Sequence, residues 1–255
     1  MTAATQIESG PQPARRSTMA RPALMLLAAT EYERSAALLK TLSASDWTRA
    51  TACPGWDVRV MATHVLGMAE MAASIREGGR QMLAAKRAGG VFIDSLTARQ
   101  VADRSGLSPA QLTERFRLVG PRAARARRRT PGFIRNRTMP VPQVVGGRPE
   151  SWTMGFLIDT ILTRDTWMHR IDIARATNRP LLLSADHDGL IVSDVVNEWA
   201  GRHRKACNVE LTGLAGGSWV FGSDGALLEL DAIDFCRTLS GRAPAEGLLS
   251  TEVPF

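Results

Sequence analysis

The sequence has few of the residues that mark several protein classes. Its 255 residues include only 3 cysteines, Cys53, Cys207 and Cys236, an odd number at wide separations. A disulfide framework is therefore not expected, and the chain is predicted to work in a reducing compartment. Aromatic residues make up 5% of the chain, and no array of them accompanies its basic residues, as base stacking on RNA would require.

Long apolar runs are also missing. The most apolar stretches are interrupted by Arg, Asp or Glu after a few residues, so no membrane span is predicted. Residues 1–20 are polar and proline-bearing, without the apolar centre of a signal peptide. We therefore expect a disordered lead-in over 1–20 and a cytoplasmic protein with no membrane partner.

Basic residues are in excess, with 32 Lys and Arg against 25 Asp and Glu and a net charge of +7. A cluster at the end of one predicted helix and in the following loop comprises Arg122, Arg125, Arg127, Arg128, Arg129, Arg135 and Arg137. The helix dipole favours cations there, and such clusters are most often solvated faces. A site for an anionic small molecule is the alternative, and a nucleic-acid partner ranks last.

Hydrophobic periodicity predicts helices up to residue 178 and a different pattern beyond it. The predicted helices span 21–42, 57–76, 91–104, the stretch from 108 into the arginine cluster, and 151–176, with a polar, glycine-bearing stretch over 78–90. Short strands at 209–212, 218–222 and 227–230 and helices near 187–203 and 232–239 follow. The predicted fold is mainly α, a four-helix bundle over 21–178 and a small α+β domain over 179–255.

Three ionisable residues fall on the apolar stripe of the helix predicted at 151–176. At about 100° per residue, Asp165, His169 and Asp172 share this stripe, and the arginines of the helix lie off it. A carboxylate and an imidazole facing an apolar interior cost on the order of several kcal/mol if uncompensated. Either salt bridges and hydrogen bonds compensate them, or a divalent metal held by Asp165 and His169 does.

His64 is a further inward-facing histidine, on the stripe of the helix predicted at 57–76. A histidine in such a place is most often a satisfied core residue. Cys53 lies in the turn ACPGW before this helix, and no neighbour identifies it as an activated thiol, so a catalytic role is not expected. We expect Trp56, Trp152 and Trp167 to be packing residues rather than a binding site.

Two segments together resemble a known family. DWTRATACPGWDVRVMATHVLG (46–67) and TWMHRIDIARATNRP (166–180) are similar to the mycothiol-dependent maleylpyruvate isomerase family of actinobacteria. LELDAIDFCRTLSGR and the closing VPF resemble the family's C-terminal segment, so that the resemblance covers 24–255. It implies a DinB-like four-helix bundle that holds a divalent metal, usually zinc, and a small α+β C-terminal domain.

The resemblance also implies a ligand set and further site residues. The family's metal ligands match His64, Asp165 and His169, with Asp165 where a glutamate with one more methylene is common. Asp172 would orient a ligand histidine or pair with an arginine. Arg242, with Arg237 as the second choice, matches the arginine that the family places near its site for an acidic substrate.

The function implied by the resemblance is chemistry on an external thiol. The metal would activate mycothiol for addition to a small, electrophilic and acidic substrate, and in the isomerase a cis double bond is converted to trans by addition, rotation and elimination. A mycothiol S-transferase is the alternative within this chemistry, and a non-catalytic metal-dependent binding protein is the alternative from another class. The expected cofactors are zinc or another divalent metal and mycothiol, and the expected partners are a small-molecule substrate and this low-molecular-weight thiol.

Overall fold

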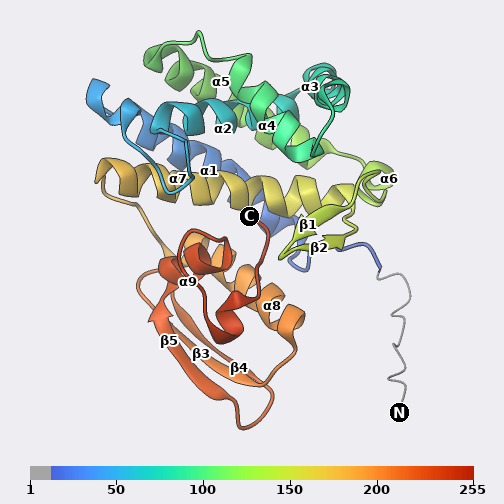
Figure 1. Ribbon diagram of the computed structural model, residues 1–255, viewed down its shortest axis with the longest axis vertical. Coiled ribbons are helices and arrows are strands. Elements are labelled where there is room, and N and C mark those ends of the chain that lie inside the picture. Colours follow the sequence, from blue (N-terminus) through green and yellow to red (C-terminus); the bar gives the residue numbers. More distant parts are fainter. Residues whose placement is uncertain (1–12) are drawn as a thin grey trace, which may run out of the picture.

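Four long helices form a bundle in the computed structural model, which describes residues 13–255 (Figure 1). They are α1 (Arg21–Lys40), α2 (Val58–Ala73), α5 (Pro109–Arg129) and α7 (Leu162–Thr177). Two shorter helices, α3 (Ile75–Ala88) and α4 (Phe92–Ala102), pack against α2. The connections contain the 3-10 turn η1 (Ala44–Thr48), the one-turn helix α6 (Gly132–Arg135) and the hairpin β1 (Gln143–Val145) and β2 (Arg148–Glu150).

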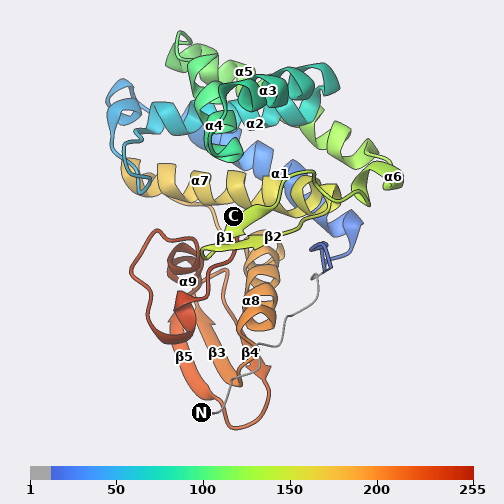
Figure 2. The same ribbon diagram turned by 45° about the vertical axis from the view of Figure 1, so that its right-hand side comes forward.

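The C-terminal part is a three-stranded sheet covered by two helices (Figure 2). Its elements are η3 (Ala185–Gly189), α8 (Leu190–His203), β3 (Cys207–Thr212), β4 (Gly217–Phe221), β5 (Ala226–Asp231), α9 (Ala232–Leu239) and η4 (Gly247–Ser250). The strand order is β4-β3-β5, with β3 antiparallel to β4 and parallel to β5. Alternate residues of β3 are buried with α8 and α9, as expected for a sheet with one covered face. The predicted fold class, a mainly α bundle with a small α+β C-terminal part, is confirmed.

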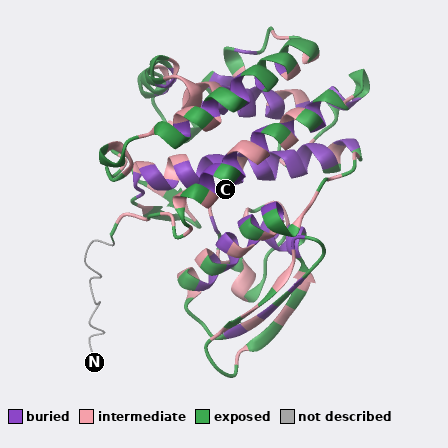
Figure 3. Ribbon diagram, turned by 180° about the vertical axis from the view of Figure 1, so that it is seen from behind, coloured by how far each residue is buried: buried purple, intermediate pink, exposed green. Residues whose placement is uncertain are grey.

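Helix α7 lies between the bundle and the C-terminal part and contributes to the core of each (Figure 1). Ile173 and Ala174 pack with the bundle helices, whereas Trp167, Met168 and Ile171 pack with α8, α9 and β3. Buried residues therefore run along the whole helix (Figure 3). No helix among residues 13–255 is long and apolar enough to cross a membrane.

The polar, glycine-bearing stretch at 78–90 is helical as far as Ala88, as part of α3, and the helix predicted at 57–76 ends at Ala73. The Ser74 hydroxyl accepts a hydrogen bond from the Glu77 backbone and begins the new helix. A Cβ at position 78 would lie 3.1 Å from the Met71 backbone oxygen, so Gly78 permits the close approach of α3 to α2. Gly78 thus favours the tight packing of α3 on α2.

The helix predicted at 151–176 also begins differently. A π-helical turn, η2 (Phe156–Ile161), precedes α7, and this wide turn leaves backbone carbonyls without regular α-helical partners. The buried Arg127 on α5 donates to the carbonyls of Ile158 (2.7 Å) and Asp159 (3.3 Å). This member of the predicted arginine cluster is therefore a structural residue, not a solvated one.

The sequence predicts a disordered lead-in over 1–20, and residues 1–12 of this segment lie outside the described residues. The described remainder is ordered, because the Arg15 backbone exchanges hydrogen bonds with Ser151 and Thr153, and the Thr18 hydroxyl donates to Asp194.

At the C-terminal end of the bundle, α7 stops at Asn178, whose backbone is in the left-handed conformation. We propose this position as the boundary between the domains 21–178 and 179–255.

A buried ion network joins α1 and α7 to η3. Arg170 donates to both oxygens of Glu31 (2.7 and 3.1 Å) and to Asp188 (2.8 Å), and His187 Nε2 lies 2.9 Å from Glu31. All four residues are buried. Removing one charge from such a network leaves the others uncompensated in a poorly solvated interior. The junction between the bundle and the C-terminal part therefore depends on Glu31.

We predict that Glu31→Gln lowers the free energy of unfolding by about 3 kcal/mol. Urea denaturation at neutral pH measures this change. Glu33→Gln is the matched control, since Glu33 is exposed on the same helix and its replacement is expected to change stability by about 0.5 kcal/mol or less. Equal stability of the two variants would contradict the structural role of the network.

Candidate metal centre

The turn before α2 fixes the direction in which this helix starts. Gly55 has a positive φ of 77°, and the Trp56 backbone nitrogen donates to the Cys53 carbonyl. Asp57 then caps α2 by accepting a hydrogen bond from the Val60 backbone at 2.8 Å. His64 follows on the inner face of α2 and is 5% exposed.

The structure brings His64 together with Asp165 and His169, the three residues predicted as metal ligands. Asp165 and His169 lie one turn apart on α7 and face α2. Oδ1 of Asp165 is 3.6 Å from Nε2 of His64 and 3.5 Å from Nε2 of His169. Ligand atoms about 2.0–2.2 Å from a tetrahedral zinc ion lie about 3.3–3.6 Å from one another, so these spacings suit a metal. The short Asp165 side chain reaches both imidazoles.

Two buried polar atoms of this cluster lack hydrogen-bond partners among residues 13–255: Oδ2 of Asp165 and Nδ1 of His64. A carboxylate oxygen without a donor is costly in the interior, and a cation between the three side chains would remove this cost. The residues present therefore fit a divalent metal with two nitrogen ligands and one oxygen ligand.

The charges of the cluster lead to the same requirement. Burial disfavours the charged carboxylate of Asp165, but the imidazoles of His169 and His64 hold its pKa well below the usual value. Burial likewise disfavours charged His169, but the carboxylates of Asp165 and Asp172 raise its pKa well above the usual value. The cluster thus needs positive charge at its centre, as an imidazolium or as a metal ion.

Asp172 and Arg242 lie together beside His169, on the side away from Asp165. Oδ2 of Asp172 is 3.3 Å from Nδ1 of His169, and Nε of Arg242 donates to both carboxylate oxygens of Asp172 (2.8 and 3.0 Å). Arg242 follows Gly241, which has a φ of 75° and ends α9. Arg242 thus belongs to the C-terminal part, and its side chain reaches Asp172 on the bundle helix α7. Arg237, the second choice, instead pairs with Asp234 on its own helix.

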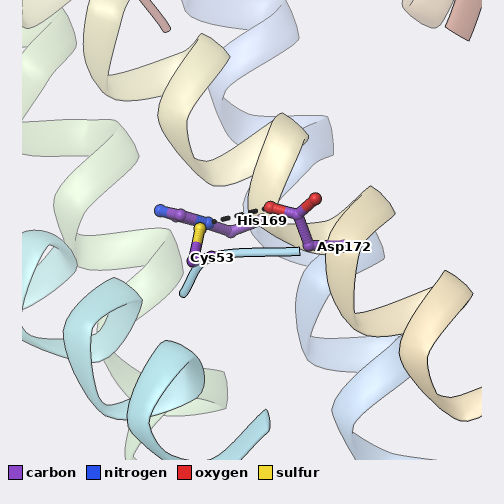
Figure 4. Close-up of side chains that lie close together, drawn as sticks. All are labelled: Cys53, His169 and Asp172. Atoms are coloured by element: carbon purple, nitrogen blue, oxygen red, sulfur yellow. Dashed lines mark hydrogen bonds and ion pairs between the residues drawn. The ribbon is translucent and has the colours of Figure 1, made fainter. Parts of the chain in front are cut away.

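Cys53 is a neighbour of the cluster that sequence reasoning set aside. Its sulfur lies 3.8 Å from Nη2 of Arg242, and Cys53, His169 and Asp172 offer ligand atoms within 4.8 Å of one another (Figure 4). Asp172 and Asp165 face the two ring nitrogens of His169, so that Cys53 shares this imidazole with two carboxylates.

Trp56 also belongs to this site, whereas the other two tryptophans considered are buried packing residues. Trp152 contacts Phe156, and Trp167 stacks on Phe255. The Trp56 ring is half-buried and lies 5.3 Å from the ring of His64 and 6.0 Å from that of His169. The sequence signal was the ACPGW turn, whose Cys53 and Trp56 both lie beside the cluster.

The arginine cluster at residues 122–137 is not part of this centre. Arg127 binds the η2 carbonyls, and Arg135 forms an ion pair with Asp159. Arg122, Arg125, Arg128, Arg129 and Arg137 are exposed. The prediction of a solvated face fits these five residues but not Arg127 or Arg135.

Comparison with known proteins relates this geometry to a family. A model of the mycothiol maleylpyruvate isomerase N-terminal domain matches residues 28–174, which include all three candidate ligands. The chain belongs to this family. No curated protein sequence matches it.

Solved structures of this family have the same fold. A crystal structure of the mycothiol-dependent maleylpyruvate isomerase matches 92% of this chain and 95% of that chain, with a TM-score of 0.57 and 14% identity. A histidine-to-alanine mutant of that enzyme matches over the same shares with a TM-score of 0.56. At this identity the likeness establishes the fold, which includes both the bundle and the C-terminal part.

We predict that one thiol of the native protein reacts rapidly with Ellman's reagent and that it belongs to Cys53. Cys53 is half-buried, whereas Cys207 and Cys236 are 1% and 0% exposed, and burial raises the pKa of both of these thiols. Cys53→Ser should remove the rapid phase, and denaturant should expose the other two thiols. A rapid phase that persists in Cys53→Ser would contradict the placement of Cys53.

Proposed function

We propose that this chain is a mycothiol-dependent enzyme that uses a divalent metal, zinc in the first instance, to activate the thiol for reaction with a small, electrophilic and acidic substrate. Membership in the maleylpyruvate isomerase family supports the thiol and the reaction class. The observation that carries the metal is the convergence of His64, Asp165 and His169 around a buried carboxylate oxygen that has no hydrogen-bond partner among residues 13–255.

His64, Asp165 and His169 would hold the metal through Nε2, a carboxylate oxygen and Nε2. A divalent metal held by these three residues would supply Lewis-acid chemistry that favours the thiolate form of a thiol at neutral pH. Asp172 orients His169 by accepting a hydrogen bond from Nδ1, which leaves Nε2 free of a proton and directed at the metal position.

Arg242 supplies the cation for an acidic substrate. One carboxylate of charge −1 from Asp165 and one thiolate would together offset a divalent metal, so a separate positive charge is needed to bind an anion. Only Nε of Arg242 is bound to Asp172, and the guanidinium has further N–H donors for a substrate carboxylate or a developing enolate. Asp172 thus positions both a metal ligand and the anion-binding arginine.

The direct test is to incubate the zinc-loaded protein with mycothiol and maleylpyruvate and to follow cis-to-trans conversion by NMR. Conversion that requires both zinc and mycothiol would support the isomerase. A stable mycothiol adduct would instead identify an S-transferase, and metal binding with neither product would identify a binding protein. Conversion that proceeds without the metal or without the thiol would contradict the proposed mechanism.

We predict that Arg242→Ala raises the barrier for an acidic substrate by about 2 kcal/mol or more, which is about a 30-fold loss of kcat/KM. Zinc content should be unchanged, because Arg242 is not a ligand. Arg237→Ala is the control, since Arg237 comes from the same segment but pairs with Asp234. Unchanged activity of Arg242→Ala, or an equal loss in both variants, would contradict this role.

A further inference from the structure

The two candidate ligand histidines are held in different ways. Nδ1 of His169 has Asp172 as its partner at 3.3 Å, the arrangement that usually fixes the ring of a metal-binding histidine. Nδ1 of His64 is buried and has no hydrogen-bond partner in the described part of the chain. The plane of the His64 ring must therefore be set by packing.

Trp56 provides that packing. Its ring meets His64 edge-on, with centroids 5.3 Å apart and planes at 60°, and stacks on His169 at 6.0 Å and 29°. Edge-on and offset-stacked arrangements at these distances are the favourable ones for aromatic pairs. The two imidazoles in turn meet at 5.3 Å with planes at 89°, so that one indole contacts both members of a perpendicular pair.

The backbone of Trp56 is itself fixed. Its carbonyl accepts hydrogen bonds from the Thr51 backbone and hydroxyl, both at 2.9 Å, and its amide donates to Cys53. Residues Ala50 and Asp57 pair across the base of this turn, and Asp57 caps α2. The indole is therefore anchored to the start of the helix that carries His64, not to a free loop.

We propose that Trp56 is a positioning residue of the metal centre. Its indole takes the place of the missing hydrogen-bond partner of His64 and holds Nε2 of both imidazoles toward the metal position. This inference rests on the proposed function, because it assumes that His64 and His169 bind a metal. It assigns to the aromatic residue of the ACPGW turn a role in metal affinity, separate from any contact with the thiol or the substrate.

Zinc affinity of the apoprotein, measured by competition with a chromophoric chelator, tests this role without an activity assay. We expect Trp56→Leu, which keeps apolar volume but removes the ring, to bind zinc about tenfold more weakly, the usual range for loss of a residue that orients a ligand. Trp56→Phe should retain affinity close to that of the unchanged protein. Trp219→Leu, at a half-buried tryptophan on β4, is the matched control and should change nothing.

Cobalt substitution gives a second readout. The visible absorption bands of bound Co²⁺ report ligand geometry, and they should shift in Trp56→Leu and return in Trp56→Phe. Equal zinc affinity and identical cobalt spectra in Trp56→Leu and the unchanged protein would overturn the role of Trp56 and leave the proposed function intact. If the unchanged protein binds neither ion, the metal-dependent function fails, and this inference fails with it.

Discussion

Compensation of charge around one buried helix is the constraint on which the structure depends. Helix α7 is covered by the bundle on one side and by the C-terminal part on the other, yet it carries charged residues toward both. Arg164 pairs with Asp194 and Glu198, and Arg170 pairs with Glu31 and Asp188. A buried charge that loses its partner costs more free energy than the ion pair itself contributes to stability. These contacts therefore fix how the bundle and the C-terminal part pack.

The same constraint singles out the candidate metal centre. Asp172 is compensated by Arg242, whereas Asp165 is left with two imidazoles and one oxygen that has no donor among residues 13–255. The cluster at Asp165 is thus the place where the helix lacks a fixed protein cation, which is the property expected of residues that bind a metal.

Much of this site follows from the sequence, because helical periodicity alone places Asp165, His169 and Asp172 on one stripe and His64 on the inner face of its helix. Family resemblance was needed to connect the two helices and to select Arg242, since periodicity does not state which helices face each other. The α+β character of the C-terminal part and the Asp231 cap of α9 were also predictable from local residues.

Other features depend on tertiary packing and left no local signal. Helix α3 forms despite Gly78 because that glycine allows contact with α2, and the π-helical turn before α7 is stabilised by Arg127 from a distant segment. The burial of Arg164 and Arg170 depends on the C-terminal part covering α7, which an amphipathic pattern does not show. Trp56 resembled a packing residue, and its contact with both histidines became evident only in the assembled bundle.

The most direct test of this account is X-ray absorption at the zinc edge of the loaded protein, before and after addition of mycothiol. We predict a resting centre with two imidazoles and one carboxylate, with nitrogen and oxygen at about 2.0–2.2 Å and no sulfur, and a new sulfur scatterer at about 2.3 Å after the thiol is added. Sulfur already bound in the resting protein, or a centre that stays unchanged when mycothiol is added, would contradict it.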